Sequence, residues 1–473
     1  MVYFVQKPRT LLGGGKMQDF LSKIEELGVR EKTRTEKKEI GQFFTSAASA
    51  SFMANMVELS NETIKILDPG AGAGILAAAV TLHLLEKKEI SDVQITFVET
   101  DPGVLPLLQQ TIEMLKQKCE KRNVKLSTIV IFGNFITTNV GTDFDIVISN
   151  PPYLKIRKDS IESIAMSKYV YGQPNLYGLF MCRSLELLRD GGQYVFITPR
   201  SWTSGAYFQQ VRSYLRADLN IEHLHIFERR NKAFSNNNVL QETMILSGIK
   251  SEAQKDYIQI SISSDDTYDD LSLFPASANI IMPDKPDKPL LIPSSESDIS
   301  VIEKMSGLSD SFDSLGYAFK TGPVVEFRNA NDISAYESEL AQIPMFRSSN
   351  IQETGFAFPV NNGKAQYVSE RAAKLLLPNQ NTVLVKRLSS KEEKRRLQSC
   401  PYYQDICAPY ISVENHVNYL TRKDGAPLKR EEVAWVQSIL MSEQYDTFFR
   451  IVNGSTQVNA KDLNSLPVGR LSV

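Results

Sequence analysis

Apolar and polar positions between residues 64 and 263 alternate between two spacings. β-rich apolar runs lie at 64–67, 93–98, 128–132, 144–149, 194–198, 221–227 and 242–246. Stretches with helical spacing lie between them, at 75–88, 104–122, 176–188 and 207–215. Strands that alternate with helices of this length predict an α/β fold with a mostly parallel sheet and helices on both faces.

The composition changes on either side of this region. A helix is expected at 18–27, inside an N-terminal extension (1–36) that precedes the α/β domain (37–262). Three glycines stand before Met17, which predicts either a flexible tail or a natural start at Met17. Ser, Asp and Pro dominate 263–297, as expected of a connector. A C-terminal region, 298–473, has a pattern of short strands with few helices, and we expect a mixed α/β domain there.

The composition excludes several protein classes. Of 473 residues 42% are hydrophobic and 23% are charged, as in an ordinary globular protein. No apolar run is long enough to span a membrane, and the first residues lack the features of a secretory signal. The four cysteines are scattered without a Cys-x-x-Cys pair, which predicts a cytoplasmic protein without a metal site. The net charge is −2, so any nucleic-acid binding requires a local basic patch.

A glycine turn follows the first strand of the α/β region. Asp68 and Pro69 precede Gly70, Gly72 and Gly74, and the next strand ends at Glu99. Glycines let a ligand approach the main chain, and an acid at the end of the next strand accepts hydrogen bonds from ribose hydroxyls. Such glycines also occur in plain tight turns. The spacing differs from the dinucleotide fingerprint and favours S-adenosylmethionine.

The fourth strand ends in Asn150, Pro151, Pro152 and Tyr153. Two prolines fix the backbone and remove two N–H donors, so the segment presents hydrogen-bond acceptors. The Asn150 side chain and the Pro151 carbonyl can accept both hydrogens of one planar amino group. The nitrogen lone pair is then free to attack a sulfonium methyl. The Tyr153 ring offers a face on which a base can stack.

These motifs resemble those of the N6-adenine DNA methyltransferases in the gamma arrangement, the modification enzymes of restriction systems. The resemblance covers 37–246 and implies a Rossmann-like methyltransferase domain followed by a target recognition domain. It also implies a role for three further sites. Thr45, in Gly41–Thr45, would contact the methionine end of the cofactor; Asn134 and Phe135 would bind its adenine, although the family usually has Asp at 134; and Phe234 would stack on the flipped base.

The resemblance implies an adenine-specific enzyme that flips its target base out of duplex DNA. The protein is expected to be a monomer, and any cognate restriction endonuclease is expected to be a separate protein. Weaker similarity to recognition regions lies at 321–325, 385–387, 414–416 and 453–458.

A basic run in the C-terminal region is a candidate for phosphate contact. It contains Lys386, Arg387, Lys394, Arg395 and Arg396. The alternative is a charged helix face, which is the usual interpretation of such a run. Candidates for contact with base edges are Arg347, Asn350 and Asn415.

Three competing functions remain open at this stage. Protein glutamine methyltransferases and rRNA methyltransferases use the same Asn-Pro-Pro-Tyr motif, although the former are smaller. A catalytically silent DNA-binding subunit is the third, and the intact Asn150–Tyr153 motif argues against it.

Overall fold

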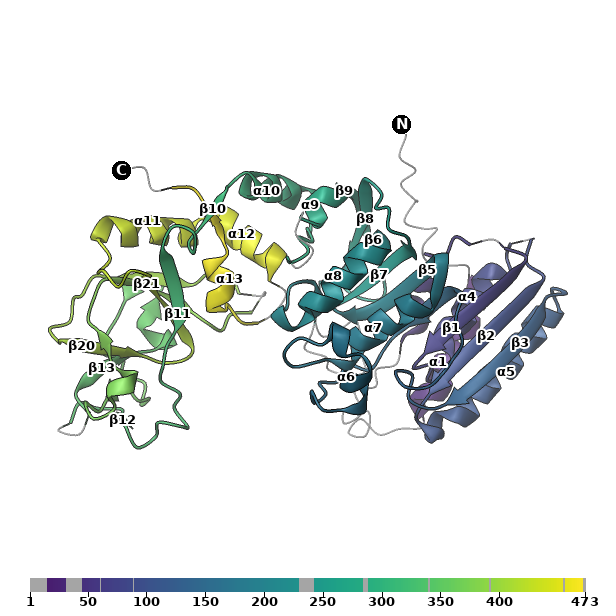
Figure 1. The fold of residues 1–473 in the computed structure, drawn as a ribbon, viewed down its shortest axis with the longest axis horizontal. Coiled ribbons are helices and arrows are strands. Elements are labelled where there is room, and N and C mark those ends of the chain that lie inside the picture. Colours follow the sequence, from purple (N-terminus) through teal and green to yellow (C-terminus); the bar gives the residue numbers. More distant parts are fainter. Residues whose placement is uncertain are drawn as a thin grey trace. The chain divides into compact units, whose positions relative to one another are not determined.

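The computed structural model describes residues 15–30, 45–59, 61–87, 89–228, 242–283, 288–338, 341–390, 393–453 and 456–470. It divides the chain into two compact units, Met1–Ser294 and Ser295–Val473. Figure 1 labels many of the helices and strands of both units.

A single large sheet forms the centre of the first unit. In the described residues it has nine strands in the order β3-β2-β1-β4-β5-β7-β6-β8-β9. β1 to β5 pair in parallel, whereas β7 is antiparallel to both of its neighbours. The strands are β1 (Thr63–Pro69), β2 (Asp92–Glu99), β3 (Lys125–Phe132), β4 (Phe144–Ser149), β5 (Leu188–Pro199), β6 (Leu219–Phe227), β7 (Thr243–Lys250), β8 (Tyr257–Ser263) and β9 (Ser272–Ser277).

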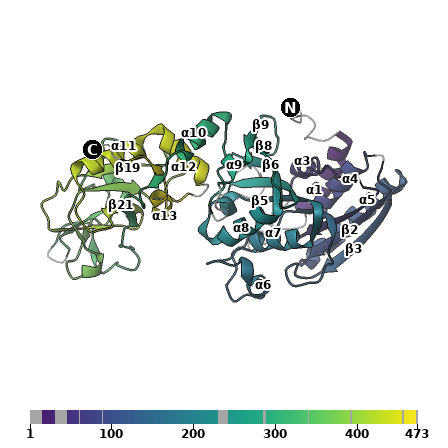
Figure 2. The same ribbon diagram turned by 45° about the horizontal axis from the view of Figure 1, so that its top comes forward.

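Helices cover this sheet in two groups. The main ones are α1 (Gly15–Arg30), α3 (Ala47–Ala54), α4 (Ile75–Leu84), α5 (Leu105–Glu120), α6 (Ile161–Ala165), α7 (Leu176–Leu187) and α8 (Gln209–Asp218). The first four pack on one another, and α7 packs on α8. Figures 1 and 2 both show α7 beside α8. The chain moves from β1 to β2 in one direction and from β4 to β5 in the other, so right-handed crossovers place α4 and α7 on opposite faces.

The predicted α/β pattern is confirmed, and β4 has the predicted bounds, 144–149. The predicted connector is the main difference. Within 263–297, β9 pairs antiparallel with β8 and is followed by the short helix α9 (Ala278–Ile281). β9 contains the apolar residues Leu273 and Phe274, but Ser and Asp residues lie around it in the sequence. These polar residues give the segment the composition of a connector, so the strand was not predicted.

Two buried histidines lie on β6, beside the parallel strand β8. His223 Nε2 and His225 Nδ1 lie 2.7 and 2.8 Å from the Ser261 hydroxyl oxygen. Phe52 of α3 packs against the His225 ring at a centroid distance of 4.7 Å. Burial lowers the pKa of His223 to about 4 and lowers that of His225 as well. Both imidazoles are therefore neutral in the folded protein at neutral pH.

Two small sheets and four helices make up most of the second unit as described. One sheet has the order β11-β21-β18-β19 and the other β12-β16-β13-β20-β17. The longer strands are β11 (Tyr317–Thr321), β13 (Ile343–Phe346), β18 (Thr382–Lys386), β19 (Ser399–Tyr402), β20 (Tyr410–Val413) and β21 (Val417–Arg422). The short strands are β10 (Asp310–Ser311), β12 (Ile333–Ser334), β14 (Ile351–Gln352), β15 (Gly355–Phe356), β16 (Tyr367–Val368), β17 (Leu377–Pro378) and β22 (Pro467–Val468). The helices are α10 (Glu296–Ser306), α11 (Arg430–Met441), α12 (Glu443–Val452) and α13 (Ala460–Asn464).

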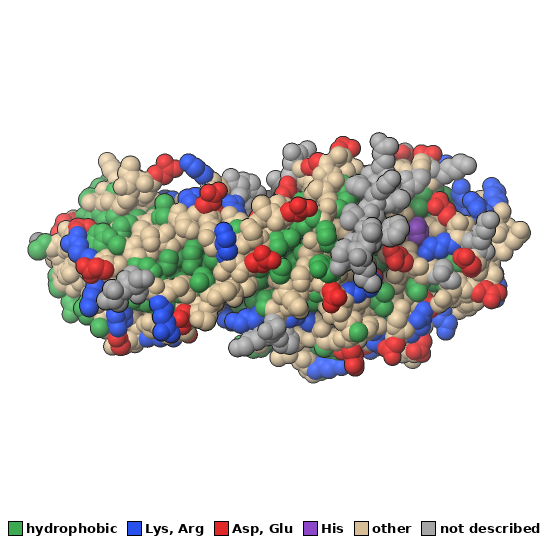
Figure 3. Space-filling model, turned by 90° about the horizontal axis from the view of Figure 1, so that it is seen from above, with side chains coloured by type: hydrophobic (Ala, Val, Ile, Leu, Met, Phe, Trp, Pro, Cys, Tyr) green, Lys and Arg blue, Asp and Glu red, His purple; other side chains and the backbone are tan. Residues whose placement is uncertain are grey.

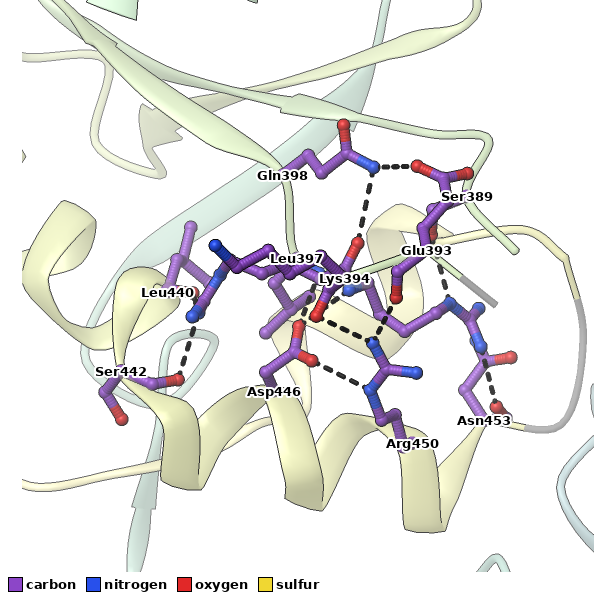
Figure 4. Close-up of polar contacts among 12 residues, drawn as sticks. Ser389, Glu393, Lys394, Leu397, Gln398, Leu440, Ser442, Asp446, Arg450 and Asn453 are labelled. Carbon is purple, nitrogen blue, oxygen red and sulfur yellow. Dashed lines mark hydrogen bonds and ion pairs between the residues drawn. The ribbon is translucent and has the colours of Figure 1, made fainter. Parts of the chain in front are cut away.

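Part of the basic run holds this unit together rather than facing solvent (Figure 4). Arg396 is fully buried, donates to the Ser389 hydroxyl at 3.0 Å, and lies 5.5 Å from the centre of the Phe449 ring. Arg395 donates at 3.1 Å to the carbonyls of Leu440 and Ser442, where α11 ends and α12 begins.

A second contact ties the same segment to α12. The Asp446 carboxylate accepts from the backbone N–H groups of Arg396 and Leu397, and Arg450 donates to it at 2.9 Å. The proposed phosphate contact is therefore wrong for Arg396, because its guanidinium is enclosed, and Arg395 is engaged with helix ends. Lys394 is exposed.

The other predicted DNA contacts in this unit have mixed outcomes. Arg347 and Asn350 are buried: Arg347 pairs with Glu326, and Asn350 Nδ2 donates to the Ala357 carbonyl at 2.7 Å. Their proposed contact with base edges is therefore wrong. Asn415 is partly exposed, so the structure leaves its prediction open.

Lys386 and Arg387 also make contacts within the unit, although both are partly exposed. Lys386 Nζ donates to Gln398 Oε1 at 2.9 Å, and Arg387 Nη1 donates to the Asn415 carbonyl at 3.1 Å. Their contact with phosphate stays a prediction.

The described surface shows no strong segregation of charge on the face seen in Figure 3, where Lys and Arg side chains are interspersed with Asp and Glu. No described helix combines the length and the apolar character needed to cross a bilayer. Among the described residues, no group of three or more His, Cys, Asp or Glu side chains is placed to hold a metal ion.

The two buried histidines predict a pH dependence of stability. An unfolded histidine takes up a proton below its ordinary pKa of about 6.5, whereas folded His223 stays neutral down to about pH 4. Stability is therefore lost as the pH falls from about 6.5 to about 4, by about 3 kcal/mol for His223 alone. In His223→Gln, urea unfolding of the first unit should depend less on pH across this window. An unchanged pH dependence would contradict the assignment.

Because Arg396 is fully buried, its removal should lower the stability of the second unit strongly. Arg396→Ala leaves the Ser389 hydroxyl without this donor and opens space beside Phe449, so the free energy of unfolding of the second unit should fall by about 3 kcal/mol. Lys394→Ala is the matched control, and we expect a change within about 0.5 kcal/mol. Urea unfolding followed by the fluorescence of Trp435 in α11 measures both. An Arg396→Ala protein that keeps its stability but loses affinity for DNA would restore the phosphate-contact prediction.

Candidate active site

The predicted motifs meet at the carboxyl ends of neighbouring parallel strands. β1 pairs with β2 on one side and with β4 on the other, so the glycine turn, Glu99 and Asn150 follow adjacent strands. The Ser149 hydroxyl donates to the Pro69 carbonyl at 2.7 Å and ties the ends of β4 and β1 together. A cavity of about 470 Å³ opens at this edge, within the range of small-molecule sites.

The glycine turn adopts backbone conformations that other residues rarely take. Gly70, Gly72 and Gly74 have φ angles of 75°, 54° and 78°. Gly70 and Gly72 line the cavity, and a Cβ atom at Gly72 would have no neighbour within 4 Å. The main chain at Gly72 is thus open to a ligand. Gly74 is outside the cavity lining, and a Cβ there would lie 2.7 Å from Leu108 of α5. Because Gly74 has no side chain, Leu108 of α5 can pack closely against the turn.

Glu99 lines the cavity and organises the loops around it. Its carboxylate accepts from the backbone N–H of Gly72 at 2.8 Å, Thr100 at 2.7 Å and Asp101 at 2.9 Å. The side chain is 4% exposed, so these contacts hold its charge beside the cavity at low solvent access. Glu99 therefore joins the glycine turn to the end of β2.

Asp68 is buried behind this arrangement and does not line the cavity. Its Oδ2 accepts from the backbone N–H of Ala77 in the first turn of α4, at 3.2 Å. Burial raises the pKa of the Asp68 carboxyl well above its ordinary value. The predicted direct contact of Asp68 and Gly74 with the cofactor is thus replaced by support of the turn and of α4.

Asn150 lines the cavity together with Pro151 and Pro152. Its Nδ2 donates to the Thr45 hydroxyl at 3.1 Å, and Thr45 lines the cavity too. This bond sets which end of the Asn150 amide faces Thr45. A Cβ at Gly70 would lie 3.9 Å from both the Asn150 carbonyl oxygen and Pro152 Cδ, so the glycine turn and this motif are close neighbours.

Tyr153 lies next to the cavity without lining it. Its hydroxyl donates to the Ile197 carbonyl at 3.2 Å, and its ring meets Tyr177 edge-on at a centroid distance of 6.0 Å. Burial raises the pKa of the Tyr153 hydroxyl well above its ordinary value. Taken as a whole residue, Tyr153 is partly exposed.

Asn134 and Phe135 line the cavity beyond the end of β3. Asn134 Oδ1 accepts from the Ile136 N–H at 3.0 Å, and its Nδ2 donates to Glu162 Oε1 at 2.7 Å. The Asn134 Oδ1 carbonyl, the one side-chain acceptor that this residue could offer to the adenine of a cofactor, thus already holds its own loop. Phe135 packs against Phe180 of α7 at a centroid distance of 4.9 Å.

Some predicted residues lie outside the described part of the chain. These are Gly41–Phe44, which precede Thr45, and Phe234, the predicted second stacking residue. Their roles stay predictions.

Several residues at this edge were missed by the sequence analysis. Phe180 and Glu162 line the cavity, and so does Glu25 of α1, whose Oε2 accepts from the Ala47 N–H at 2.8 Å. Lys155 and Lys158 follow Tyr153 closely and are exposed. The cations within 155–158 form a short basic run beside the motif, which the sequence could have revealed.

The cavity suits S-adenosylmethionine in its chemistry. Open main chain at Gly72 and the charge of Glu99 fit a ribose, and the apolar ring of Phe135 fits a flat base. Asn150, Pro151 and Pro152 line the same cavity as the glycine turn and Glu99.

Comparison with known proteins identifies the family. Residues 82–234 match the model of the Eco57I restriction-modification methylase family. Type II methyltransferase M.BsuBI of Bacillus subtilis is 33% identical over 449 residues, which cover 91% of this chain and 87% of that protein. Type II methyltransferase M.PstI of Providencia stuartii is 32% identical over 447 residues, with the same two coverages.

Solved structures share the fold. The DNA-bound type ISP restriction-modification enzyme LlaBIII gives a TM-score of 0.51 at 12% identity and covers 91% of this chain and 39% of that one. The DrdV–DNA complex gives 0.50 at 13% identity and covers 95% and 57%.

These relatives favour DNA over protein glutamine or rRNA as the substrate class. With S-adenosylmethionine as the cofactor that its fold and family use, the chain belongs to the type II DNA methyltransferases of restriction-modification systems.

Proposed function

We propose that this enzyme methylates the N6 amino group of adenine in duplex DNA, at a specific site, after flipping the base out of the helix. The observation that carries the proposal is the Asn150–Tyr153 motif at the rim of the cavity. The Asn150 amide is oriented by Thr45, and Asn150, Pro151 and the glycine turn line the same cavity. These neighbours support a role for Asn150 and Pro151 as acceptors for the amino group beside the cofactor.

The chemistry follows from the acceptors. An exocyclic amine is a poor nucleophile because its lone pair is delocalised into the ring. The Asn150 side-chain carbonyl and the Pro151 main-chain carbonyl accept its two hydrogens and favour a pyramidal nitrogen. Bound S-adenosylmethionine supplies the electrophilic methyl group. Both acceptors also stabilise the positive charge that develops on nitrogen during transfer, where such contacts are worth most.

Tyr153 holds the flipped base. In this proposal the ring of Tyr153, a partly exposed residue, offers the stacking face. Its hydroxyl is anchored on the Ile197 carbonyl, so the ring orientation is fixed before the base arrives. A second ring at Phe234 completes the base pocket in this proposal. Flipping is required because the amino group is paired inside a duplex.

Sequence choice belongs to the second unit, Ser295–Val473, which acts as the target recognition domain in this proposal. Exposed Lys155 and Lys158 lie next to the motif in sequence and are the first candidates for phosphate contact near the flipped base. The enzyme acts as a monomer, and a cognate endonuclease, where one exists, is a separate protein.

The target atom is tested by the product. Duplex DNA methylated by the purified enzyme and digested to nucleosides should contain N6-methyladenine when analysed by mass spectrometry. N4-methylcytosine in its place would contradict adenine specificity while leaving the amino-directed mechanism intact. Methylation of a carbon atom would overturn the role of Asn150.

Replacement of Asn150 should slow the chemical step of methylation. Asn150→Ala removes one acceptor, so the single-turnover rate of methylation should fall by about 10²–10³ while DNA and cofactor still bind. Asn150→Asp keeps an acceptor and should retain more activity. Asn139→Ala is the matched control, since Asn139 is exposed and outside the cavity lining. A full rate in Asn150→Ala would rule out the mechanism.

A further inference from the structure

The mechanism proposed above does not use the hydrogen bond between Asn134 and Glu162. Ile136 donates its N–H to Asn134 Oδ1 at 3.0 Å, which turns the Asn134 amino group toward Glu162. That amino group donates to Glu162 Oε1 at 2.7 Å. Asn134 therefore presents a donor where the related enzymes are expected to present an acid. The carboxylate that it contacts belongs to Glu162, on a different segment.

Glu162 faces the cofactor cavity. It comes from α6, lines the same cavity as Asn134 and Phe135, and is partly exposed. Among the described residues, Asn134 is the one that forms a hydrogen bond with the Glu162 side chain. A carboxylate offers about four acceptor positions, so this contact leaves capacity for a ligand.

The strand order places the adenine of the cofactor at this end of the cavity. Asn150 follows β4 and Glu99 follows β2, with β1 between them. If the sulfonium lies near Asn150 and the ribose near Glu99, the base attached to the far side of the ribose extends toward β3. Gly133 donates its N–H to the Glu99 carbonyl at 2.9 Å, which brings the loop that follows β3 against the end of β2. Asn134 is the next residue in that loop.

We propose that the Glu162 carboxylate accepts a hydrogen bond from the 6-amino group of the cofactor's adenine, with Asn134 as its positioning residue. The inference rests on the assignment of this cavity to the cofactor. A carboxylate accepts and cannot donate when it is ionised, so it binds a 6-amino purine and repels a 6-oxo purine. Glu162 thus determines which base the cofactor site accepts.

Exchange of the carboxylate for an amide tests this selectivity. In Glu162→Gln the Asn134 amino group holds the new Oε1, so the new amino group faces the ligand and acts as a donor. The ligands are S-adenosylhomocysteine and S-inosylhomocysteine, its 6-oxo counterpart, and calorimetry measures both dissociation constants. The wild-type protein should prefer the 6-amino ligand roughly tenfold to a hundredfold, and Glu162→Gln should lose or reverse this preference.

A double variant separates selectivity from damage to the fold. In Asn134→Asp/Glu162→Gln the new carboxylate at position 134 accepts from the new side-chain amino group at position 162. The amide oxygen at position 162 then faces the ligand, so the preference for the 6-amino ligand should return. Asp159→Asn is the matched control, because Asp159 is an exposed acid in the same segment that does not line the cavity. Its preference should equal that of the wild type.

The outcomes distinguish the inference from the assignment of the cavity. Glu99→Ala should weaken S-adenosylhomocysteine binding whichever residue reads the base. If it does so while Glu162→Gln keeps the wild-type preference, the role of Glu162 is overturned and the cavity assignment stands. If folded Glu99→Ala and Glu162→Gln both bind with wild-type affinity and preference, both assignments fail.

Discussion

The contact between the ends of β1 and β4 is the constraint on which the active site depends. The two strands pair in parallel, with Ile66 opposite Ile146 and Leu67 opposite Val147, so both motifs emerge at the same level. The Ser149–Pro69 hydrogen bond ties the ends of the two strands together, and Gly70 takes the positive φ of 75° that the turn beside the Asn150–Pro152 segment requires. In the proposed mechanism this arrangement brings the cofactor and the substrate amine to one point. Glu99 extends the arrangement by tying the glycine turn to β2.

Much of the catalytic unit could be predicted because its signals are local. β4 is buried at all six positions, and its β-rich run Phe-Asp-Ile-Val-Ile-Ser, followed by Asn-Pro-Pro-Tyr, marked both the strand and the motif. The strand β9 was missed because only part of its surface is buried, so its sequence resembles that of a connector. Asp68 and Gly74 belong to the predicted motif, but only the packed structure shows that they support the turn from behind.

Residues whose roles depend on distant partners could not be predicted. Arg396 sits in a run of cations that predicts solvent or phosphate contact, yet Ser389, Asp446 and Phe449 enclose it. The sequence did not indicate a role for Glu162, because that role depends on its hydrogen bond with Asn134, which lies on another segment. Both cases show a charged side chain whose role is set by tertiary packing and not by its neighbours in the chain.

The central claim is that the cavity at the ends of β1, β2 and β4 holds the cofactor with its reactive end at Asn150. A crystal structure of the protein with S-adenosylhomocysteine tests this most directly. The account predicts the ribose at Glu99, the adenine between Phe135 and Glu162, and the sulfur facing Asn150. The reacting nitrogen and the methyl carbon of the active complex could then approach within about 3–3.5 Å. A ligand bound elsewhere, or with its sulfur turned away from Asn150, would contradict the account.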